Sequence, residues 1–148
     1  MTIEEFKSLL NNSDVDYEIL QNEKPILTVN DAIGIYEISE TAPTIIIKSE
    51  KGYFALLLSG DRERIDFKQI KKILICKNVR MARAEEVLET IGYEAGNVPL
   101  VGHHLPCVLD QHLLNYRYVY GGVGDANFTL KINPRDLIKV NDIVAEID

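Results

Sequence analysis

The sequence predicts an α+β protein in which helices surround a mixed, barrel-like β-sheet. β-rich runs and segments with helical spacing of apolar residues follow one another along the chain. They do not alternate strictly as strand, helix, strand, which a doubly wound parallel sheet would require. The length of 148 residues suits a single core, and no repeat, linker or low-complexity tract divides it. Residues 1–148 are therefore expected to form one domain.

Five elements are expected in the first half of the chain. Thr2 and Glu5 have the spacing of a capping box at a helix start. Gly52 lies where two β-rich runs would turn into a hairpin, and Asp66 is placed to cap a helix. The expected elements are a helix at 3–11, a strand at 16–20, a short helix at 28–34, a hairpin at 44–48 and 53–58, and a helix at 67–73.

The second half is expected to alternate helices and short strands around one irregular loop. Gly92 follows an amphipathic segment as a helix end, Asp110 can cap a helical turn, and Asn133-Pro134 is typical of a helix start. Between them lies GYEAGNVPLVGHHLP (92–106), which gathers glycines and prolines that fix backbone N–H groups in place. The expected elements are helices at 83–91, 111–114 and 134–140, with strands at 107–109, 116–120 and 127–132.

Composition and charge limit the classes of protein. Hydrophobic residues make up 46% without a long apolar run, and MTIEEFKSLL is acidic, so neither a membrane span nor a signal peptide is expected. Cys76 and Cys107 are expected to be reduced, in a cytoplasmic protein. The net charge of −7 argues against a surface that coats nucleic acid broadly, but residues 62–83 carry eight basic and two acidic side chains. This basic strip fits either a local polyanion contact or a solvated helix face.

Two clusters of chemically active residue types do not form a recognised site. His103, His104, Cys107 and His112 lie within ten residues but lack the paired short spacings typical of zinc ligands, so no metal is expected. Cys107 stands in the apolar run LPCVL, which favours a buried structural thiol over a nucleophile. The segment GGVGDAN (121–127) lacks the spacing of a dinucleotide-binding loop and is expected to be a turn, or a place where a ligand approaches the backbone.

A series of short motifs, taken together, resembles a known family. In order, they are TIII at 44–47 with Gly52, SGDR at 59–62, Ala82 with EEV at 85–87, Gly92-x3-Gly96, Pro99-x2-Gly102, LPCVLD at 105–110, YVYGG at 118–122 and NPRDLIKV at 133–140. Their order and spacing resemble the YbaK / prolyl-tRNA synthetase-associated editing-domain family, the aminoacyl-tRNA deacylases. The resemblance extends over roughly residues 15–141.

The resemblance implies an enzyme of translation fidelity. Such a hydrolase cleaves the ester between a wrong amino acid and the 3′-adenosine of a tRNA, often tRNA for proline. It implies no metal, no cofactor and no covalent nucleophile, and backbone donors from the loop at 96–100 near the ester. The implied partners are the acceptor end of a tRNA and prolyl-tRNA synthetase.

Candidate site residues follow from the resemblance and from the basic strip. The catalytic candidates are Lys48 and His103. The expected substrate-binding residues are Thr44, Gly96, Asn97, Val98, Pro99, Leu100, Gly102, Asp110, Gly121 and Gly122. The expected tRNA-binding residues are Lys68, Lys71, Lys72 and Arg80.

Two positions depart from the family pattern. Pro43 stands where family members that cleave usually carry a lysine, and Lys48 and Lys131 are alternative sources of that charge. The proline of the loop, Pro99, comes one place early relative to the common G-x-x-x-P. Two functions therefore remain open: a trans-editing deacylase, and a non-catalytic paralogue that binds tRNA, a nucleotide or a protein partner.

Overall fold

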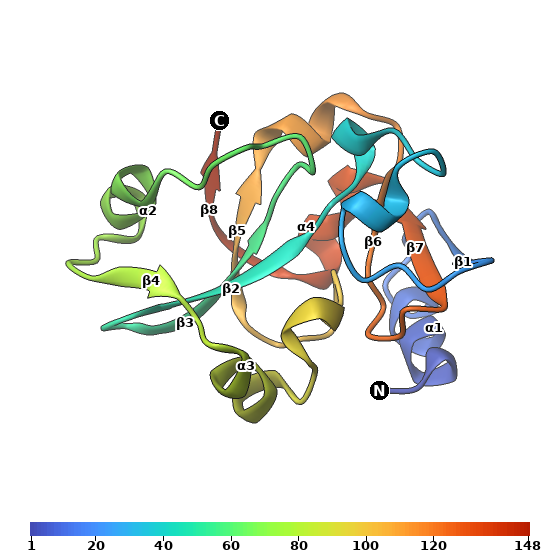
Figure 1. The fold of residues 1–148 in the computed structure, drawn as a ribbon, viewed down its shortest axis with the longest axis horizontal. Helices are drawn as coiled ribbons and strands as arrows, with labels where there is room; N and C mark the ends of the chain where they lie inside the picture. Colours follow the sequence, from blue (N-terminus) through green and yellow to red (C-terminus); the bar gives the residue numbers. More distant parts are fainter.

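Two β-sheets organise the computed structural model, which describes all 148 residues (Figure 1). Their strands run in both directions: β2 pairs antiparallel with β3 and β4, whereas β5 pairs parallel with β3 and β8. The larger sheet has the order β4 (Val79–Met81), β2 (Thr44–Ser49), β3 (Gly52–Leu57), β5 (Pro106–Asp110) and β8 (Asp142–Ile147). The smaller has the order β1 (Tyr17–Gln21), β7 (Phe128–Ile132) and β6 (Val119–Gly121).

The two sheets meet just before β2. Thr41 forms an isolated parallel bridge with Tyr120, and the Ala42 N–H donates to the Tyr120 carbonyl at 2.7 Å. The sheets do not close into one barrel, but this junction joins them edge to edge at Thr41 and Tyr120. The mixed strand directions confirm the predicted α+β class.

Helices cover the outer faces and the ends of the sheets. Figure 1 shows α1 beside the smaller sheet and α2 at the opposite end of the molecule. The helices are α1 (Ile3–Asn11), α2 (Phe67–Leu74), α3 (Ala84–Ile91) and α4 (Leu137–Val140), with 3-10 turns at Asn30–Ala32, Ile38–Glu40, Ala95–Asn97, Gln111–Asn115 and Pro134–Asp136. No helix is both long and apolar enough to cross a membrane.

The predicted caps are present. Thr2 and Glu5 form both hydrogen bonds of the capping box, and Asp66 accepts from two N–H groups at the start of α2. Gly92 ends α3 with φ +78°, a left-handed conformation that glycine adopts without a Cβ clash. These local signals explain why most helix boundaries were predicted to within one or two residues.

Several boundaries differ from the sequence-based expectation. The helices expected at 28–34 and 111–114 are 3-10 turns, and the last helix begins as a 3-10 turn before α4. The strand expected at 116–120 begins only at Val119, because the preceding turn extends to Asn115. β4 and β8 were not predicted: β4 lies in the basic strip, and β8 is an edge strand with an alternating, partly exposed pattern.

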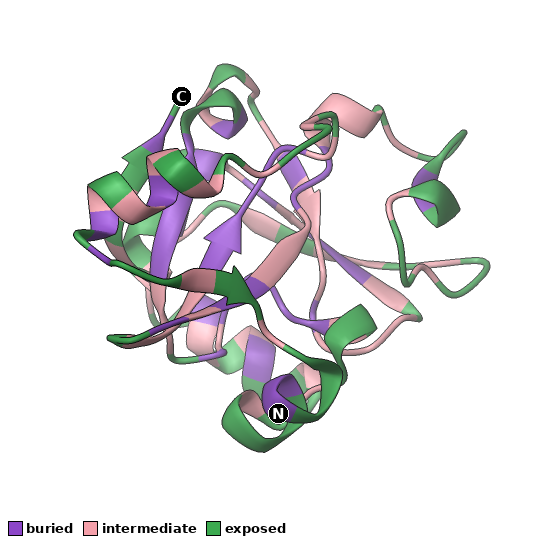
Figure 2. Ribbon diagram, turned by 60° about the vertical axis from the view of Figure 1, so that its left-hand side comes forward, coloured by how far each residue is buried: buried purple, intermediate pink, exposed green.

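The core has two parts. One lies between the two sheets and α1, where Phe6, Leu57 and Leu130 are almost fully buried. The other lies between the larger sheet and α2, around Ile47 and Ile70. Figure 2 shows the buried residues concentrated on the strands in the middle of the molecule, with the helix surfaces exposed.

A buried ion pair ties the end of β5 to the segment after β3. Asp110 has no exposed surface, and its carboxylate accepts from Arg62 Nε at 2.9 Å, from Arg62 Nη2 at 3.1 Å and from the Ser59 N–H at 2.9 Å. It also accepts from the His112 N–H at 3.0 Å. Although burial alone would raise the pKa of Asp110, these donors hold it below the ordinary value.

We expect Asp110→Ala to lower the free energy of unfolding at pH 7 by about 3 kcal/mol, because Arg62 loses its only buried partner. The folded-state pKa of Asp110 lies below the unfolded value near 3.8, so the stabilisation is fully present above about pH 4. It is lost as the pH falls through the lower, folded-state pKa. Urea unfolding from pH 7 to pH 2.5 measures this difference, with Glu63→Gln, at an exposed residue, as control. An equal difference at both ends of that range contradicts the assignment.

Candidate functional site

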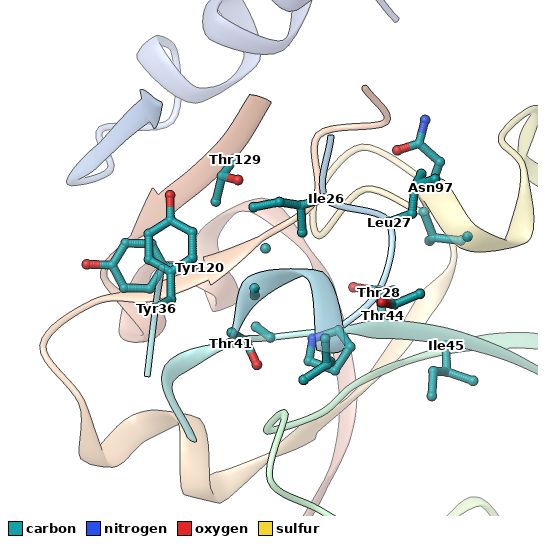
Figure 3. Close-up of a pocket in the computed structure, with 18 of the residues that line it drawn as sticks. Ile26, Leu27, Thr28, Tyr36, Thr41, Thr44, Ile45, Asn97, Tyr120 and Thr129 are labelled. Atoms are coloured by element: carbon teal, nitrogen blue, oxygen red, sulfur yellow. The ribbon is translucent and has the colours of Figure 1, made fainter. Parts of the chain in front are cut away.

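One cavity of about 240 Å³ opens where the two sheets meet (Figure 3). Four segments line it: the arm at 26–36, the entry to β2 at 41–45, the loop at 95–98, and the stretch of β6 and β7 from 120 to 129. Of its 21 lining residues, 11 are hydrophobic, and the polar ones are mainly threonines. Such a concave, mostly apolar site with a few polar groups is typical of small-ligand binding.

Glycines at 121 and 122 allow the cavity floor to form. A Cβ on Gly121 would lie 2.7 Å from Leu100 Cδ2, and a Cβ on Gly122 would lie 2.7 Å from the Val98 carbonyl oxygen. The Leu100 N–H donates to the Gly122 carbonyl at 2.9 Å, which fixes the loop against the end of β6. A side chain at Gly122 would therefore clash with the backbone of the loop, and one at Gly121 would displace the buried side chain of Leu100.

The polar surface of the cavity is made of hydroxyl groups, backbone groups, the Asn97 amide and one carboxylate. Thr44 Oγ1 is buried and has no hydrogen-bond partner in the chain. In contrast, Thr41 donates to the Ile38 carbonyl at 2.7 Å, and Thr129 donates to Asn22 Oδ1 at 2.8 Å. Thr44 is therefore the lining residue whose buried hydroxyl is left without a partner in the chain.

Asp125 is the one charged side chain on the cavity wall, since no lysine, arginine or histidine lines it. Its Oδ1 accepts from the Asn127 N–H at 2.9 Å, which holds the carboxylate in a turn between β6 and β7. The cavity consequently favours a cationic group over an anionic one at this wall.

Two tyrosines form a flat wall. The rings of Tyr36 and Tyr120 stack with centroids 4.2 Å apart and an interplanar angle of 20° (Figure 3). Burial raises the pKa of both phenols, so both stay neutral over the physiological range. This wall offers apolar ring surface with hydroxyl groups at its edge.

The structure brings six of the ten expected substrate-binding residues to this cavity. They come from β2, from the loop after α3 and from the end of β6. Asn97 is fixed by a hydrogen bond from its Nδ2 to the Gly124 carbonyl at 2.6 Å. The six are Thr44, Gly96, Asn97, Val98, Gly121 and Gly122.

The other four lie away from the cavity lining. Leu100 is fully buried beneath the floor, and Pro99 is buried beside it. Gly102 lies next to the side chain of Met1, and the carboxylate of Asp110 is engaged by Arg62. None of these four positions lines the cavity.

Neither catalytic candidate lines the cavity. Lys48 Nζ lies 3.4 Å from Glu86 Oε2 and over the ring of Tyr53. His103 is buried, and burial lowers its pKa to about 4, so it is neutral at pH 7. Its Nε2 lies 3.6 Å from Cys107 Sγ, and burial raises the pKa of that thiol to about 12. The pair has no thiolate to attack a substrate.

The expected tRNA-binding residues fall into two groups. Lys68 and Lys72 are exposed on α2 and Lys71 is partly exposed, and none of the three forms an ion pair. Arg80 instead makes a bidentate pair with Glu86, at 2.7 and 3.0 Å. No group of three or more histidine, cysteine or acidic side chains is arranged to hold a metal.

Sequence reasoning missed several residues that line the cavity. Thr28 and Tyr36 lie at or beyond the ends of a segment that was expected to be a short helix and was given no role in binding. Asp125 lies in GGVGDAN, which was interpreted as a turn or a place where a ligand approaches the backbone, but the residue itself was not singled out. Two features of the sequence could have indicated a part of this wall. They are the tyrosines of YVYGG and the aspartate of GGVGDAN, which lie next to the glycines already singled out. Their proximity to the arm depends on long-range contacts.

The fold and cavity define a small α+β domain built around one ligand pocket. The sequence matches the family model of the aminoacyl-tRNA editing domain over residues 23–140, so the chain belongs to that family. The resemblance seen in the sequence motifs is thereby confirmed.

Known relatives agree with this assignment. A proline–tRNA ligase of Thermosipho africanus is 29% identical over 71% of this chain, and that of Fervidobacterium nodosum is 27% identical over 82%. The chain spans only 19% and 21% of the length of these two relatives. The crystal structure of a hypothetical protein superposes with a TM-score of 0.86 at 32% identity, covering 95% of this chain and 96% of that one.

A second structure has the same fold. It is described as a candidate trans-editing enzyme for prolyl-tRNA synthetase, and it superposes with a TM-score of 0.83 at 24% identity over 98% of this chain and 96% of that one.

We expect Thr44→Val to raise the free energy of unfolding, by up to about 1 kcal/mol, because it replaces a buried hydroxyl without a partner by a methyl group of the same shape. Thr129→Val is the matched control. It removes the hydrogen bond to Asn22 and is expected to lower the free energy of unfolding by about 1 kcal/mol. Urea unfolding of both variants measures the contrast. Equal losses in the two variants would show that Thr44 has a partner after all.

Proposed function

We propose that the protein is a trans-editing aminoacyl-tRNA deacylase, which hydrolyses the ester of a mischarged tRNA in the cytoplasm. Membership of the aminoacyl-tRNA editing domain family supports the reaction, and the proline–tRNA ligase relatives make tRNA for proline the first candidate. The observation that carries the proposal is the cavity itself, in which an unpartnered Thr44 hydroxyl lies among backbone groups of the glycine loops.

The size and charge of the cavity suit an aminoacyl group. A volume of about 240 Å³ accommodates a small side chain together with the ester. An aminoacyl ester carries an α-ammonium group, and the Asp125 carboxylate is the charged group available to pair with it. The Thr44 hydroxyl can donate to the ester or accept from the same ammonium.

Backbone donors supply the electrostatic part of the mechanism. The N–H groups of Gly96 and Gly122 both belong to lining residues and donate to no other group in the chain. Donors of this kind stabilise the negative charge that develops on the carbonyl oxygen when water attacks, typically by about 3 kcal/mol each. The bond from the carbonyl carbon to the ribose oxygen then breaks. The departing ribose oxygen takes one proton of the attacking water and becomes a hydroxyl, and the amino acid leaves as a carboxylate after the second proton passes to solvent.

The cavity offers no basic side chain to act as general base. Pro43 occupies its wall at the position where cleaving members of the family usually carry lysine, and the two catalytic candidates, Lys48 and His103, do not line it. In this mechanism the chain binds, orients and polarises an ester that is already activated. Water, or a group of the substrate, performs the attack.

A second candidate function is a non-catalytic paralogue that binds aminoacyl-tRNA without cleaving it. The absence of every lysine, arginine and histidine from the cavity lining favours this alternative specifically. It predicts the same ligands but no turnover.

Deacylation distinguishes the two functions. We would charge tRNA for proline separately with alanine, cysteine, serine and proline, and follow loss of the ester with and without protein. The deacylase proposal expects rapid loss of at least one mischarged species while the prolyl ester is spared. If all four esters are lost only at the rate seen in buffer while the charged tRNA still binds, the deacylase proposal is rejected and the non-catalytic paralogue is supported.

We expect Asp125→Asn to lower kcat/KM for esters with a free α-ammonium about tenfold, since one charge-assisted pair is lost. Hydrolysis of the matching N-acetylaminoacyl-tRNA is expected to be unchanged, because the acetyl group removes the positive charge. The asparagine amide oxygen still accepts from Asn127, so the turn is kept. Asp142→Asn, at an exposed carboxylate of β8, is the control. Equal losses on both substrates would remove the assigned role of Asp125.

A further inference from the structure

A second cavity adjoins the first. Its volume is about 480 Å³, and it shares Val29, Pro43 and Ile45 with the first cavity as a common wall. Beyond this wall it is lined by the segment from Leu58 to Phe67 and by Met81 at the end of β4. The two cavities therefore form neighbouring compartments on either side of Pro43.

The second cavity has the opposite charge character to the first. Arg62 and Arg64 both line it, opposed by Glu63. Arg62 is neutralised by the buried carboxylate of Asp110, whereas Arg64 is exposed and forms no ion pair. The cation available to a ligand on this wall is therefore Arg64.

Most basic residues of the strip at 62–83 that form no ion pair lie on the side of the second cavity and α2. Arg80 and Arg83 are held by Glu86 at the far end of the strip. Lys68, in contrast, is exposed one residue after Phe67, which lines the second cavity. The basic residues of the strip without an ion pair are Arg64, Lys68, Lys71, Lys72 and Lys77.

Apolar side chains complete the site. Ile65, Phe67 and Met81 line the cavity, and Met81 is 46% exposed although it is a large hydrophobic residue. A groove that combines an aromatic ring and apolar surface with unpaired cations is typical of single-stranded nucleic-acid binding, in which bases contact the apolar groups and phosphates contact the cations.

We propose that the second cavity binds the unpaired nucleotides that precede the terminal adenosine of the tRNA, with Arg64 on a phosphate and Phe67 and Met81 against a base. This inference rests on the proposed function, since it needs the aminoacyl group of the terminal adenosine in the first cavity. Because Pro43 lines both cavities, the single-stranded end of the tRNA can pass it from one cavity to the other. Ammonium recognition and phosphate recognition are thus separated by an uncharged wall.

Binding of stable analogues tests this proposal whether or not the protein cleaves esters. One ligand is 3′-alanylamino-3′-deoxyadenosine, and the other is the trinucleotide CCA that ends in the same amide. The wild-type protein is expected to bind the trinucleotide at least tenfold more tightly. Arg64→Gln is expected to weaken trinucleotide binding about tenfold and to leave nucleoside binding unchanged.

Salt dependence supplies a second readout. Loss of one phosphate contact to a single strand is expected to reduce the slope of log K against log salt by about 0.7. Lys77→Gln is the matched control, because Lys77 is an exposed, unpaired cation of the same strip that lines neither cavity. It is expected to change neither affinity nor slope by a comparable amount.

The outcomes separate the two proposals. Equal affinity of the wild-type protein for nucleoside and trinucleotide would overturn the second site, as would equal effects of Arg64→Gln and Lys77→Gln. Tight, Arg64-dependent trinucleotide binding without any ester hydrolysis would keep the second site and reject the deacylase. Weakening of both ligands by Arg64→Gln would show that Arg64 acts on the first cavity instead.

Discussion

The close approach of three backbone segments at Gly121 and Gly122 is the constraint on which the rest of the structure depends. A side chain at Gly121 would meet Leu100 and the Ala42 carbonyl, and one at Gly122 would meet the Val98 carbonyl. These contacts bring the entry to β2, the loop after α3 and the end of β6 to one point. The junction of the two sheets and the floor of the cavity are consequently the same piece of structure.

Ion pairs with two buried carboxylates determine which basic side chains remain free in this part of the molecule. Asp110 and Glu86 are buried carboxylates, and each takes up arginines that would otherwise be free: Arg62 in one case, Arg80 in the other. Donors at both sites hold the carboxyl pKa below its ordinary value, so both pairs persist at neutral pH. The first cavity is left without cations, and the basic residues of the strip at 62–83 that remain unpaired lie on or near α2 and at Lys77.

Local chemistry allowed most of the fold to be predicted from the sequence. Thr2, Asp66 and Gly92 each act within a few residues of the chain, so their caps can be inferred without knowing what packs nearby. β8 could not be predicted in the same way, because an edge strand needs β5 beside it to acquire its hydrogen bonds. The same distinction between local and long-range determinants applies to the residues of the cavity. Glycines signalled its floor, whereas Tyr36 reaches it only by stacking on Tyr120, far along the chain.

Pro43 connects these features to the chemistry. It lies one residue before β2, its carbonyl accepts from the Leu58 N–H at 3.0 Å, and its ring lines both cavities. A lysine at this position would place an ammonium group between the two compartments, where it could reach either an ester or a phosphate. Proline instead makes the wall uncharged. Under the proposed function, an ester in the first cavity is then polarised by neutral donors, namely hydroxyl groups such as that of Thr44 and backbone N–H groups. Because the glycine contacts fix those backbone groups, the proposed deacylation would depend on backbone geometry more than on a cationic side chain.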